Sequence, residues 1–368
     1  MKWNVIVVGA GFAGSTSARL LAEQGNSVLV IERLDHIAGH CYDYRDENGI
    51  TVHKFGPHIF HTDDKVAWNF VNGFSDFAYY QHRVKSFVDG MYVNFPINRD
   101  TICQLYGVDI SSNEVKNFLR NEVKNSVFSD PPENFKDAVI SQVGKYLYKK
   151  FFEGYTKKQW EIDPEKLSPE LAKRIPVRTN RDDRYFSDKY QGIPSKGYTE
   201  LVRNILKHKN ISVLTGADYF EIKSELPAEL TVYTGELDRF FDYKYGKLQY
   251  RSLDLELKTY EMENYQPVSV VNYPGNYEWT RITEFKHFLN EARYTKKTTV
   301  CFEFPKAEGE PYYIVQTKEN LERRKKYMEE VKKMENSRKY LFVGRLAEYK
   351  YYNMDQVISA VQNKLNSY

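Results

Sequence analysis

The sequence predicts an α/β protein that combines a discontinuous Rossmann-like domain, a helical insertion domain and an antiparallel β-sheet domain. Three observations lead to this prediction. The chain opens with a β-branched apolar segment and a glycine-rich turn, the usual start of a βαβ nucleotide-binding unit. Apolar residues at helical spacing then dominate the region from about residue 99 to residue 166. Several strand-like segments follow, and a last buried strand and helix complete the first domain.

The glycine-rich turn directly follows the apolar residues 5–8. Its glycines, Gly9, Gly11 and Gly14, have the spacing of a dinucleotide-binding fingerprint. The first glycine permits a tight turn, the second lets the backbone approach a pyrophosphate, and the third lets the next helix pack closely on the strand. We expect that helix over residues 15–25, with the N–H groups at its start available to phosphate oxygens.

A second strand is expected over residues 27–31, and Glu32 follows it directly. A carboxylate at this position suits a ribose 2′-hydroxyl and repels a 2′-phosphate, so the motif favours FAD or NAD over NADP. A glycine turn without a ligand is the alternative, but it does not explain why strand, glycines, helix, second strand and acid all occur in order.

Size and composition exclude several classes of protein. The 368 residues are enough for two or three domains, and a net charge of +3 gives no global attraction to nucleic acid or to a membrane surface. The isolated cysteines Cys41, Cys103 and Cys301 disfavour a disulfide framework and a zinc site. The chain enters its first strand without a signal sequence and contains no apolar run long enough to span a membrane. We therefore expect a cytoplasmic protein that binds neither nucleic acid nor membrane.

The next elements are a strand over residues 50–55 and a loop over residues 56–62, which contains His58 and His61. No cysteine or acid follows these histidines at a ligand spacing, so we predict no metal site. The alternating residues 84–95 surround an Asp-Gly dipeptide and predict a β-hairpin.

The remaining elements are expected in chain order. Helices are predicted over residues 113–125, 133–152, 198–207 and 319–335 and from about residue 354. Strands are predicted over residues 211–215, 230–235, 248–258, 267–273, 279–284, 298–304 and 340–344. The first and last of these strands are assigned to the first domain, and the strands between them to the antiparallel sheet. Residues 167–178 contain two prolines and are expected to form a connector that acts as a lid.

Aromatic and arginine residues indicate the kind of ligand. The chain has 30 tyrosines, 22 phenylalanines and 4 tryptophans, and rings with polar tips are suited to gripping a polar, ring-bearing molecule. They crowd residues 151–160, which either stack a nucleobase or form a helix end in the core. Arg178 and Arg281 are candidates for bidentate binding of a diphosphate, and ordinary surface ion pairs are the alternative for each.

The chain closely resembles the bacterial UDP-galactopyranose mutase family from the first strand to the last helix. The matching segments are residues 9–14, 56–62, 154–160, 174–178, 246–254, 280–284, 311–313 and 342–355. The resemblance implies an FAD enzyme, active when the flavin is reduced, that interconverts UDP-galactopyranose and UDP-galactofuranose without net redox for cell-surface polysaccharide synthesis. It implies an FAD-binding domain of residues 1–80, 192–230 and 317–368, a helical domain of residues 97–170, and a sheet domain of residues 81–96, 171–191 and 231–316.

The resemblance also implies roles for individual residues. The expected catalytic residues are Arg178 and Arg281, which would hold the diphosphate, and His58 beside the flavin. The expected substrate-binding residues are Phe152, Tyr155, Thr156, Trp160, Tyr185, Asn272, Tyr313, Tyr351 and His82. The expected cofactor-binding residues are Gly9, Gly11, Phe12, Ala13, Gly14, Glu32, Arg33, Gly39, His40, His58, Ile59, Phe220, Gly344, Arg345, Tyr352, Asn353 and Met354.

In this family the N5 atom of the reduced flavin attacks the anomeric carbon, UDP leaves, and the flavin–sugar adduct opens and recloses through the other hydroxyl before UDP returns. Two fixed arginines would stabilise the charge that develops on the leaving diphosphate. The resemblance further implies an external reductant and a homodimer.

Five positions depart from the family pattern. Ala38 stands where a glycine is usual, and Tyr352 where a leucine is usual. His40 stands where an asparagine is usual, Asn353 replaces an aspartate, and His82 replaces an asparagine near the sugar. These differences leave a UDP-N-acetyl sugar as an alternative substrate. Two different functions compete with the mutase activity: a redox flavoenzyme of the same fold, and a nucleotide-sugar sensor with a structural flavin.

Overall fold

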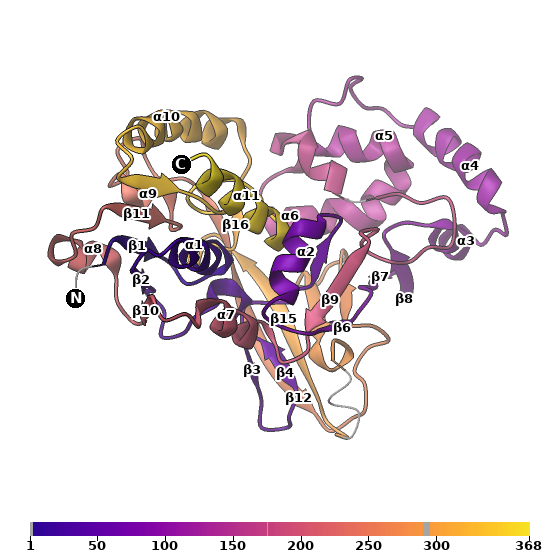
Figure 1. Ribbon diagram of the computed structural model, residues 1–368. Helices are drawn as coiled ribbons and strands as arrows, with labels where there is room; N and C mark the ends of the chain where they lie inside the picture. The colour runs from indigo at the N-terminus through magenta and orange to yellow at the C-terminus, as the bar shows by residue number, and fades with distance from the viewer. Residues whose placement is uncertain (1–2, 175, 290–294) are drawn as a thin grey trace.

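The computed structural model describes residues 3–174, 176–289 and 295–368 and is built around two large sheets (Figure 1). The first is a five-stranded parallel sheet with the strand order β10-β2-β1-β11-β17. Its strands are β1 (Val5–Val8), β2 (Val28–Ile31), β10 (Ile211–Leu214), β11 (Leu230–Tyr233) and β17 (Tyr340–Phe342). This sheet confirms the Rossmann-like fold and its assembly from segments far apart in the sequence.

Helix α1 (Phe12–Glu23) follows β1 and packs against α7 (Tyr198–Leu206) and α11 (Met354–Asn366). The helix begins earlier than predicted because Gly11 already serves as its N-cap. A Cβ atom on Gly14 would lie 1.8 Å from the carbonyl oxygen of Gly9, so this close approach of helix and turn requires glycine. Helix α2 (Lys65–Asn72) also contacts α11.

Strand β11 corrects one prediction. Residues 230–235 were expected in the antiparallel sheet, but β11 pairs in parallel with β1 and β17 within the first sheet. All four of its residues are buried, a pattern typical of parallel strands that are covered on both faces. The sheet domain therefore begins after β11 rather than at residue 231.

The second sheet has seven strands in the order β16-β12-β15-β14-β13-β7-β8. They are β7 (Val84–Val88), β8 (Met91–Phe95), β12 (Tyr250–Tyr260), β13 (Val270–Asn272), β14 (Arg281–Glu284), β15 (Thr298–Lys306) and β16 (Tyr313–Ile314). The predicted hairpin is confirmed, with positive φ angles of 50° and 78° at Asp89 and Gly90. The sheet is mixed rather than antiparallel throughout, because β7 and β13 pair in parallel across a long connection.

The helical region contains α3 (Arg99–Tyr106), α4 (Ser112–Lys124), α5 (Phe135–Leu147) and α6 (Gly154–Trp160). The prediction of one helix over residues 133–152 was wrong. Gly144, with a φ of +81°, interrupts α5 where it meets the backbone of Glu122 in α4, and a π-helical turn (Tyr148–Glu153) leads into α6. After this break α6 runs against the second sheet, where it contacts β15.

Shorter elements connect these parts. They are the pair β3 (Asp43–Arg45) and β4 (Thr51–His53), the sheet of β5 (Phe60–Thr62), β6 (Phe77–Tyr79) and β9 (Tyr190–Pro194), and the helices α8 (Tyr219–Ile222), α9 (Leu237–Phe240) and α10 (Lys318–Glu335). Residue 175 of the predicted connector and residues 290–294 of the predicted sheet domain lie outside the described residues. Within the described ranges, no helix is both long and apolar enough to cross a membrane.

We predict that Gly14→Ala lowers the free energy of unfolding by about 1–3 kcal/mol, the usual cost of overpacking a close contact. Gly11→Ala is the matched control, because a Cβ there meets no atom closer than 4.0 Å and the φ of Gly11 is −74°. Urea unfolding of the two variants measures the difference. Equal stability of both variants would contradict the packing role of Gly14.

Candidate functional site

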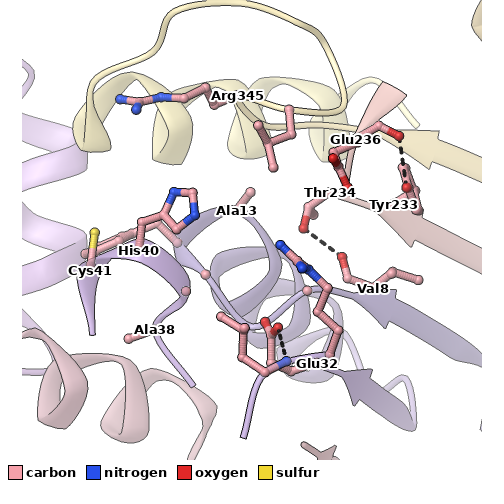
Figure 2. A pocket seen from close by; sticks show the side chains of 18 of the residues that line it. Val8, Ala13, Glu32, Ala38, His40, Cys41, Tyr233, Thr234, Glu236 and Arg345 are labelled. Carbon is pink, nitrogen blue, oxygen red and sulfur yellow. Dashed lines mark hydrogen bonds between the residues drawn. The ribbon is translucent and has the colours of Figure 1, made fainter. Parts of the chain in front are cut away.

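A pocket opens at the carboxyl ends of the parallel strands (Figure 2). Its walls come from the turn after β1, the start of α1, the end of β2, the segment after β11 and the start of α11. Glu310, in the connection between β15 and β16, adds a residue from the second sheet. Carboxyl ends of parallel strands are the usual ligand site of a doubly wound sheet.

The glycine turn shapes the floor of this pocket. Gly9 has a φ of +102°, and Gly11 caps α1 without a side-chain hydrogen bond to the N–H groups of the first turn. The first turn of α1 also carries no acidic residue. The start of this helix therefore offers N–H groups and a positive dipole end to an anion.

Glu32 lies at the end of β2, on the opposite side of the pocket from Arg345 (Figure 2). Its Oε2 accepts a hydrogen bond from the backbone N–H of Ala10 at 2.7 Å, and its Oε1 accepts one from Leu34 at 2.9 Å. These two bonds hold the carboxylate in place, where the sequence predicted an acid beside the dinucleotide.

Most of the predicted cofactor residues line this pocket. They are Gly9, Gly11, Phe12, Ala13, Glu32, Arg33, Gly39, His40, His58, Phe220, Arg345, Tyr352, Asn353 and Met354. Gly14, Ile59 and Gly344 do not line it. Gly14 instead allows a close approach to the backbone of Gly9, and Gly344 allows a close approach to the side chain of Ala13. The pocket also contains four charged residues that were not expected from the sequence: Asp218, Glu236, Arg239 and Glu310. The one available signal was the position of Glu310, directly before the motif at residues 311–313.

His58 reaches the pocket from the loop between β4 and β5. Its Nδ1 lies 2.8 Å from the carbonyl oxygen of Gly56, and its backbone N–H donates to Nδ1 of His53 at 3.0 Å. Burial and the neighbouring His53 hold the pKa of His58 well below its usual range. The ring is therefore neutral, with its proton on Nδ1, which leaves Nε2 as an acceptor.

Arg345 connects the pocket to a second group of residues. Its guanidinium donates to the carbonyl oxygens of Tyr352, at 2.7 Å, and Tyr312, at 3.3 Å, and lies 4.9 Å from the ring centre of Tyr351. Tyr351 in turn stacks with Tyr313, at 6.3 Å between ring centres. The predicted cofactor and substrate residues are thus in direct contact.

Arg281 is the centre of this second group. Its Nε lies 2.7 Å from Oε1 of Glu303, and its Nη2 donates to the hydroxyl of Tyr313 at 3.3 Å. Burial raises the pKa of Glu303, whereas the charge of Arg281 opposes this shift. Although burial disfavours its charge, the pKa of Arg281 is raised well above its usual range by Glu303. Trp160 meets Tyr313 edge-on at 6.3 Å, which adds α6 to the cluster.

Lys158 fastens α6 to the turn between β13 and β14. Its Nζ donates to the carbonyl oxygens of Tyr273 at 2.5 Å and of Gly275, Tyr277 and Trp279 at 3.0 Å each. The turn links Asn272 to Arg281, which are directly opposite each other in the sheet. Lys158 therefore fixes Tyr155, Thr156 and Trp160 relative to the arginine.

The remaining predicted substrate residues surround this cluster. Phe152 and Tyr185 both pack against Phe95, with ring centres 5.9 and 6.2 Å away. His82 is buried 5.5 Å from the ring of Tyr185, and its Nδ1 lies 3.1 Å from the hydroxyl of Tyr80. Arg178 instead bonds within its own segment, to the carbonyl oxygens of Asp182 and Arg184.

Comparison with known proteins decides the family. A family model described as UDP-galactopyranose mutase matches residues 150–351, and a model of an NAD(P)-binding Rossmann-like domain matches residues 7–74. The chain is 40% identical over 362 residues to a probable UDP-galactopyranose mutase of Klebsiella pneumoniae, and the match covers 97% of this chain and 92% of that protein. The chain belongs to the UDP-galactopyranose mutase family. This confirms the resemblance and makes the chain an enzyme of the isomerase class.

Further similarities extend this result. The chain is 39% identical over 365 residues to a dTDP-fucopyranose mutase of Escherichia coli, over 96% of this chain and 95% of that one. A crystal structure of reduced UDP-galactopyranose mutase has the same fold, with a TM-score of 0.79 at 16% identity over 100% of this chain and 96% of the other. Over 63 residues, 17% of this chain and 12% of the relative, the chain is 36% identical to flavin-containing amine oxidase A of Sus scrofa.

We predict that Lys158→Met lowers the free energy of unfolding by about 1–3 kcal/mol, because it removes the charged donor that four carbonyl oxygens of the turn share. Lys157→Met is the control, since Lys157 is half-exposed and pairs with Glu153 on the turn that precedes it. Such exposed pairs contribute about 0.5 kcal/mol or less. Urea unfolding and hydrogen exchange of residues 273–280 measure the effect. Unchanged exchange in Lys158→Met would contradict the fastening role.

His82 predicts a loss of stability in acid. Burial, with the charges of Arg281 and His61, lowers the pKa of His82 to about 3. The unfolded chain therefore binds a proton at this position near pH 6.5, whereas the folded chain does not until about pH 3. The contribution of a neutral His82 is present above pH 6.5 and is lost as the pH falls, by about 2 kcal/mol at pH 5.

We therefore expect His82→Asn to reduce, by about 2 kcal/mol, the loss of unfolding free energy between pH 7.5 and pH 5. Urea unfolding at both pH values gives this difference without reference to the absolute stability of the variant. An identical pH dependence in the variant and the unmodified protein would show that folding does not lower the pKa of His82.

Proposed function

We propose that the chain is a flavin-dependent isomerase that interconverts UDP-galactopyranose and UDP-galactofuranose, with reduced FAD as its cofactor and no net redox. The observation that carries this proposal is the contact between the cofactor pocket and the arginine cluster through Arg345 and Tyr351. A ligand in the pocket and a ligand at the cluster would be neighbours. Such an arrangement suits a reaction between a cofactor and a nucleotide sugar.

The pocket residues suit FAD. The N–H groups at the start of α1 match the pyrophosphate, Gly11 leaves room for its approach, and Glu32 matches a ribose hydroxyl. The N-terminus of α11, at Asn353 and Met354, would face the flavin with its positive dipole end and favour an anionic reduced form. The reduced flavin would supply an electron-rich nitrogen nucleophile for the anomeric carbon of the sugar. The similarity to a flavin-containing oxidase over 63 residues supports this choice of cofactor.

Arg281 would be the main residue that stabilises the negative charge of the substrate diphosphate. Breaking the anomeric bond places negative charge on the leaving diphosphate, and a fixed guanidinium stabilises that charge more than the ground state. Glu303 and Tyr313 hold the guanidinium in one orientation. Neutral His58 would accept a hydrogen bond at Nε2 and cannot donate one there. Arg178 is proposed to reach the diphosphate by movement of its segment.

The remaining residues would hold the nucleotide. Phe152, Tyr155, Thr156 and Trp160 are proposed to bind the base and ribose, with Asn272 near the base, and Tyr185, Tyr313, Tyr351 and His82 to surround the phosphates and the sugar. The proposal includes an external reductant, because the flavin must be reduced before turnover, and a homodimer in the cytoplasm.

A second candidate substrate is dTDP-fucofuranose. The chain is almost as similar to a dTDP-fucopyranose mutase as to a probable UDP-galactopyranose mutase, over nearly the full length of each. Both reactions would use the same diphosphate and the same ring contraction. The two substrates differ in the base, in the 2′-hydroxyl of the ribose and in the hydroxyl group at C6 of the sugar.

The first test is anaerobic incubation of the FAD-loaded protein with UDP-galactofuranose, with and without dithionite, followed by chromatography of the nucleotide sugars. We expect UDP-galactopyranose only in the reduced sample. Parallel samples contain dTDP-fucofuranose and UDP-N-acetylgalactosamine. Conversion of one of these instead would reassign the substrate, and stoichiometric oxidation of a sugar would favour a redox flavoenzyme.

In the same assay, Arg281→Lys is expected to lower turnover about 10²- to 10³-fold, the usual effect of removing one preorganised donor from a developing charge. FAD absorbance should stay unchanged, because Arg281 does not line the cofactor pocket. Arg83→Lys is the matched control, since Arg83 is 45% exposed and pairs with Asp183 at the surface. Full activity of Arg281→Lys would remove this residue from the reaction.

A further inference from the structure

Glu310 lies in the connection between β15 and β16 and lines the pocket, where it contacts two residues that follow β2. Its Oε1 accepts hydrogen bonds from Nη2 of Arg33 and, at 3.0 Å, from Nε2 of His40. Arg33 follows β2 and His40 follows the glycine at position 39, so both partners belong to the first domain. The carboxylate therefore joins the two halves of the molecule across the pocket.

The backbone around Glu310 is attached at two further points. The ring of Tyr312 stacks on His40, with 4.9 Å between ring centres and an interplanar angle of 18°. The carbonyl oxygen of Tyr312 accepts a hydrogen bond from Arg345 at 3.3 Å. The segment from Glu310 to Tyr312 thus rests on three pocket residues of the first domain, and it cannot move away without breaking all of these contacts.

The carboxyl group of Glu310 is ionised near neutral pH. Burial disfavours ionisation, but the hydrogen bond from His40 and the charge of Arg33 outweigh burial and lower the pKa of Glu310 to about 2. Its side chain is 23% exposed and that of Arg33 is 40% exposed, so the ion pair lies at the rim of the pocket rather than in the core. A pair at such a position holds a segment closed and still permits opening.

We infer that Glu310 is a cofactor-retention residue: with Arg33 and His40 it forms a clasp that holds the segment 307–312 across the pocket, and the cofactor leaves only when the clasp opens. This inference rests on the proposed function, which places FAD in the pocket. The clasp and Glu32 with the glycine turn line the same pocket, so the clasp would close over the adenosine diphosphate half of the cofactor.

A competing effect of the same carboxylate has the opposite sign. A carboxylate beside a pyrophosphate repels it, and removing Glu310 would release Arg33 and His40 to pair with the phosphates. Loss of the carboxylate would then slow the release of FAD. The clasp predicts faster release, so the sign of one rate change distinguishes the two effects.

The experiment measures the release of FAD from the loaded protein after dilution, through the fluorescence of the free flavin. Glu310→Gln keeps the shape of the side chain and is expected to release FAD about tenfold faster, because charge-assisted hydrogen bonds are replaced by neutral ones. Glu308→Gln is the matched control, since Glu308 is exposed on the same segment and the variant has the same net charge. Its release rate should equal that of the unmodified protein.

Two further measurements sharpen the result. Raising the salt concentration should speed release from the unmodified protein more than from Glu310→Gln, because only the former has the ion pair to be screened. Arg33→Gln should also speed release, and the double variant Arg33→Gln/Glu310→Gln should be no faster than the quicker single variant, since both changes break the same contact.

A release rate for Glu310→Gln that equals or falls below that of Glu308→Gln would overturn the clasp while leaving the proposed function intact. A protein that retains no FAD before any substitution would overturn the proposed cofactor, and the clasp with it. Thermal unfolding of the unmodified protein, Glu310→Gln and Glu308→Gln without FAD tests that these variants are folded. If Glu310→Gln is not folded, the release rate of Arg33→Gln supplies the same test of the clasp.

Discussion

The register of the second sheet is the constraint on which the substrate site depends. Asn272, Arg281 and Glu303 face one another directly across β13, β14 and β15, so their side chains share one face of the sheet. A slip of one residue between β14 and β15 would send Arg281 and Glu303 to opposite faces. It would leave the buried carboxylate of Glu303 and the partly buried guanidinium of Arg281 without each other, a cost of several kcal/mol for a buried ion. The ion pair between Arg281 and Glu303 therefore forms only in this register of β14 and β15, and its loss destabilises a register shifted by one residue.

Strand β16 extends this order to the cofactor pocket. Because successive side chains of an extended segment point in opposite directions, Tyr312 faces His40 at the pocket while Tyr313 faces Arg281 at the cluster. Contacts at Glu310, Tyr312 and Tyr313 thus serve two sites from one short segment. A shift of this segment would change contacts in both the cofactor pocket and the arginine cluster. The segment therefore offers a physical route for coupling cofactor and substrate.

The features that could be predicted from the sequence are those that depend on a local pattern of residues. The features that could not be predicted depend on contacts with residues far away in the chain. The glycine turn, Glu32, the Asp89-Gly90 hairpin and the start of α11 follow from short-range rules, and the structure places them as expected. Strand β11 was assigned to the wrong sheet, because a short apolar run does not say which strands it will lie between. Glu310 went unrecognised because its partners are 277 and 270 residues away in the sequence. The family resemblance supplied the substrate residues, which composition and spacing could not separate from ordinary core aromatics.

Three arginines of the two sites share one feature that bears on how an anionic ligand would bind. Arg281 is paired with Glu303, Arg33 with Glu310 and Arg239 with Asp218, so the charge of each arginine is already balanced within the protein. These three pairs therefore add little long-range attraction for a diphosphate, in keeping with the chain's overall charge of +3. The acids hold the guanidinium groups in fixed orientations, and a fixed donor stabilises a developing charge without the cost of reorganisation. The acid partners thus reduce the long-range attraction of each arginine for an anion but fix its orientation. A fixed orientation matters most where charge develops during the reaction, rather than in the resting complex.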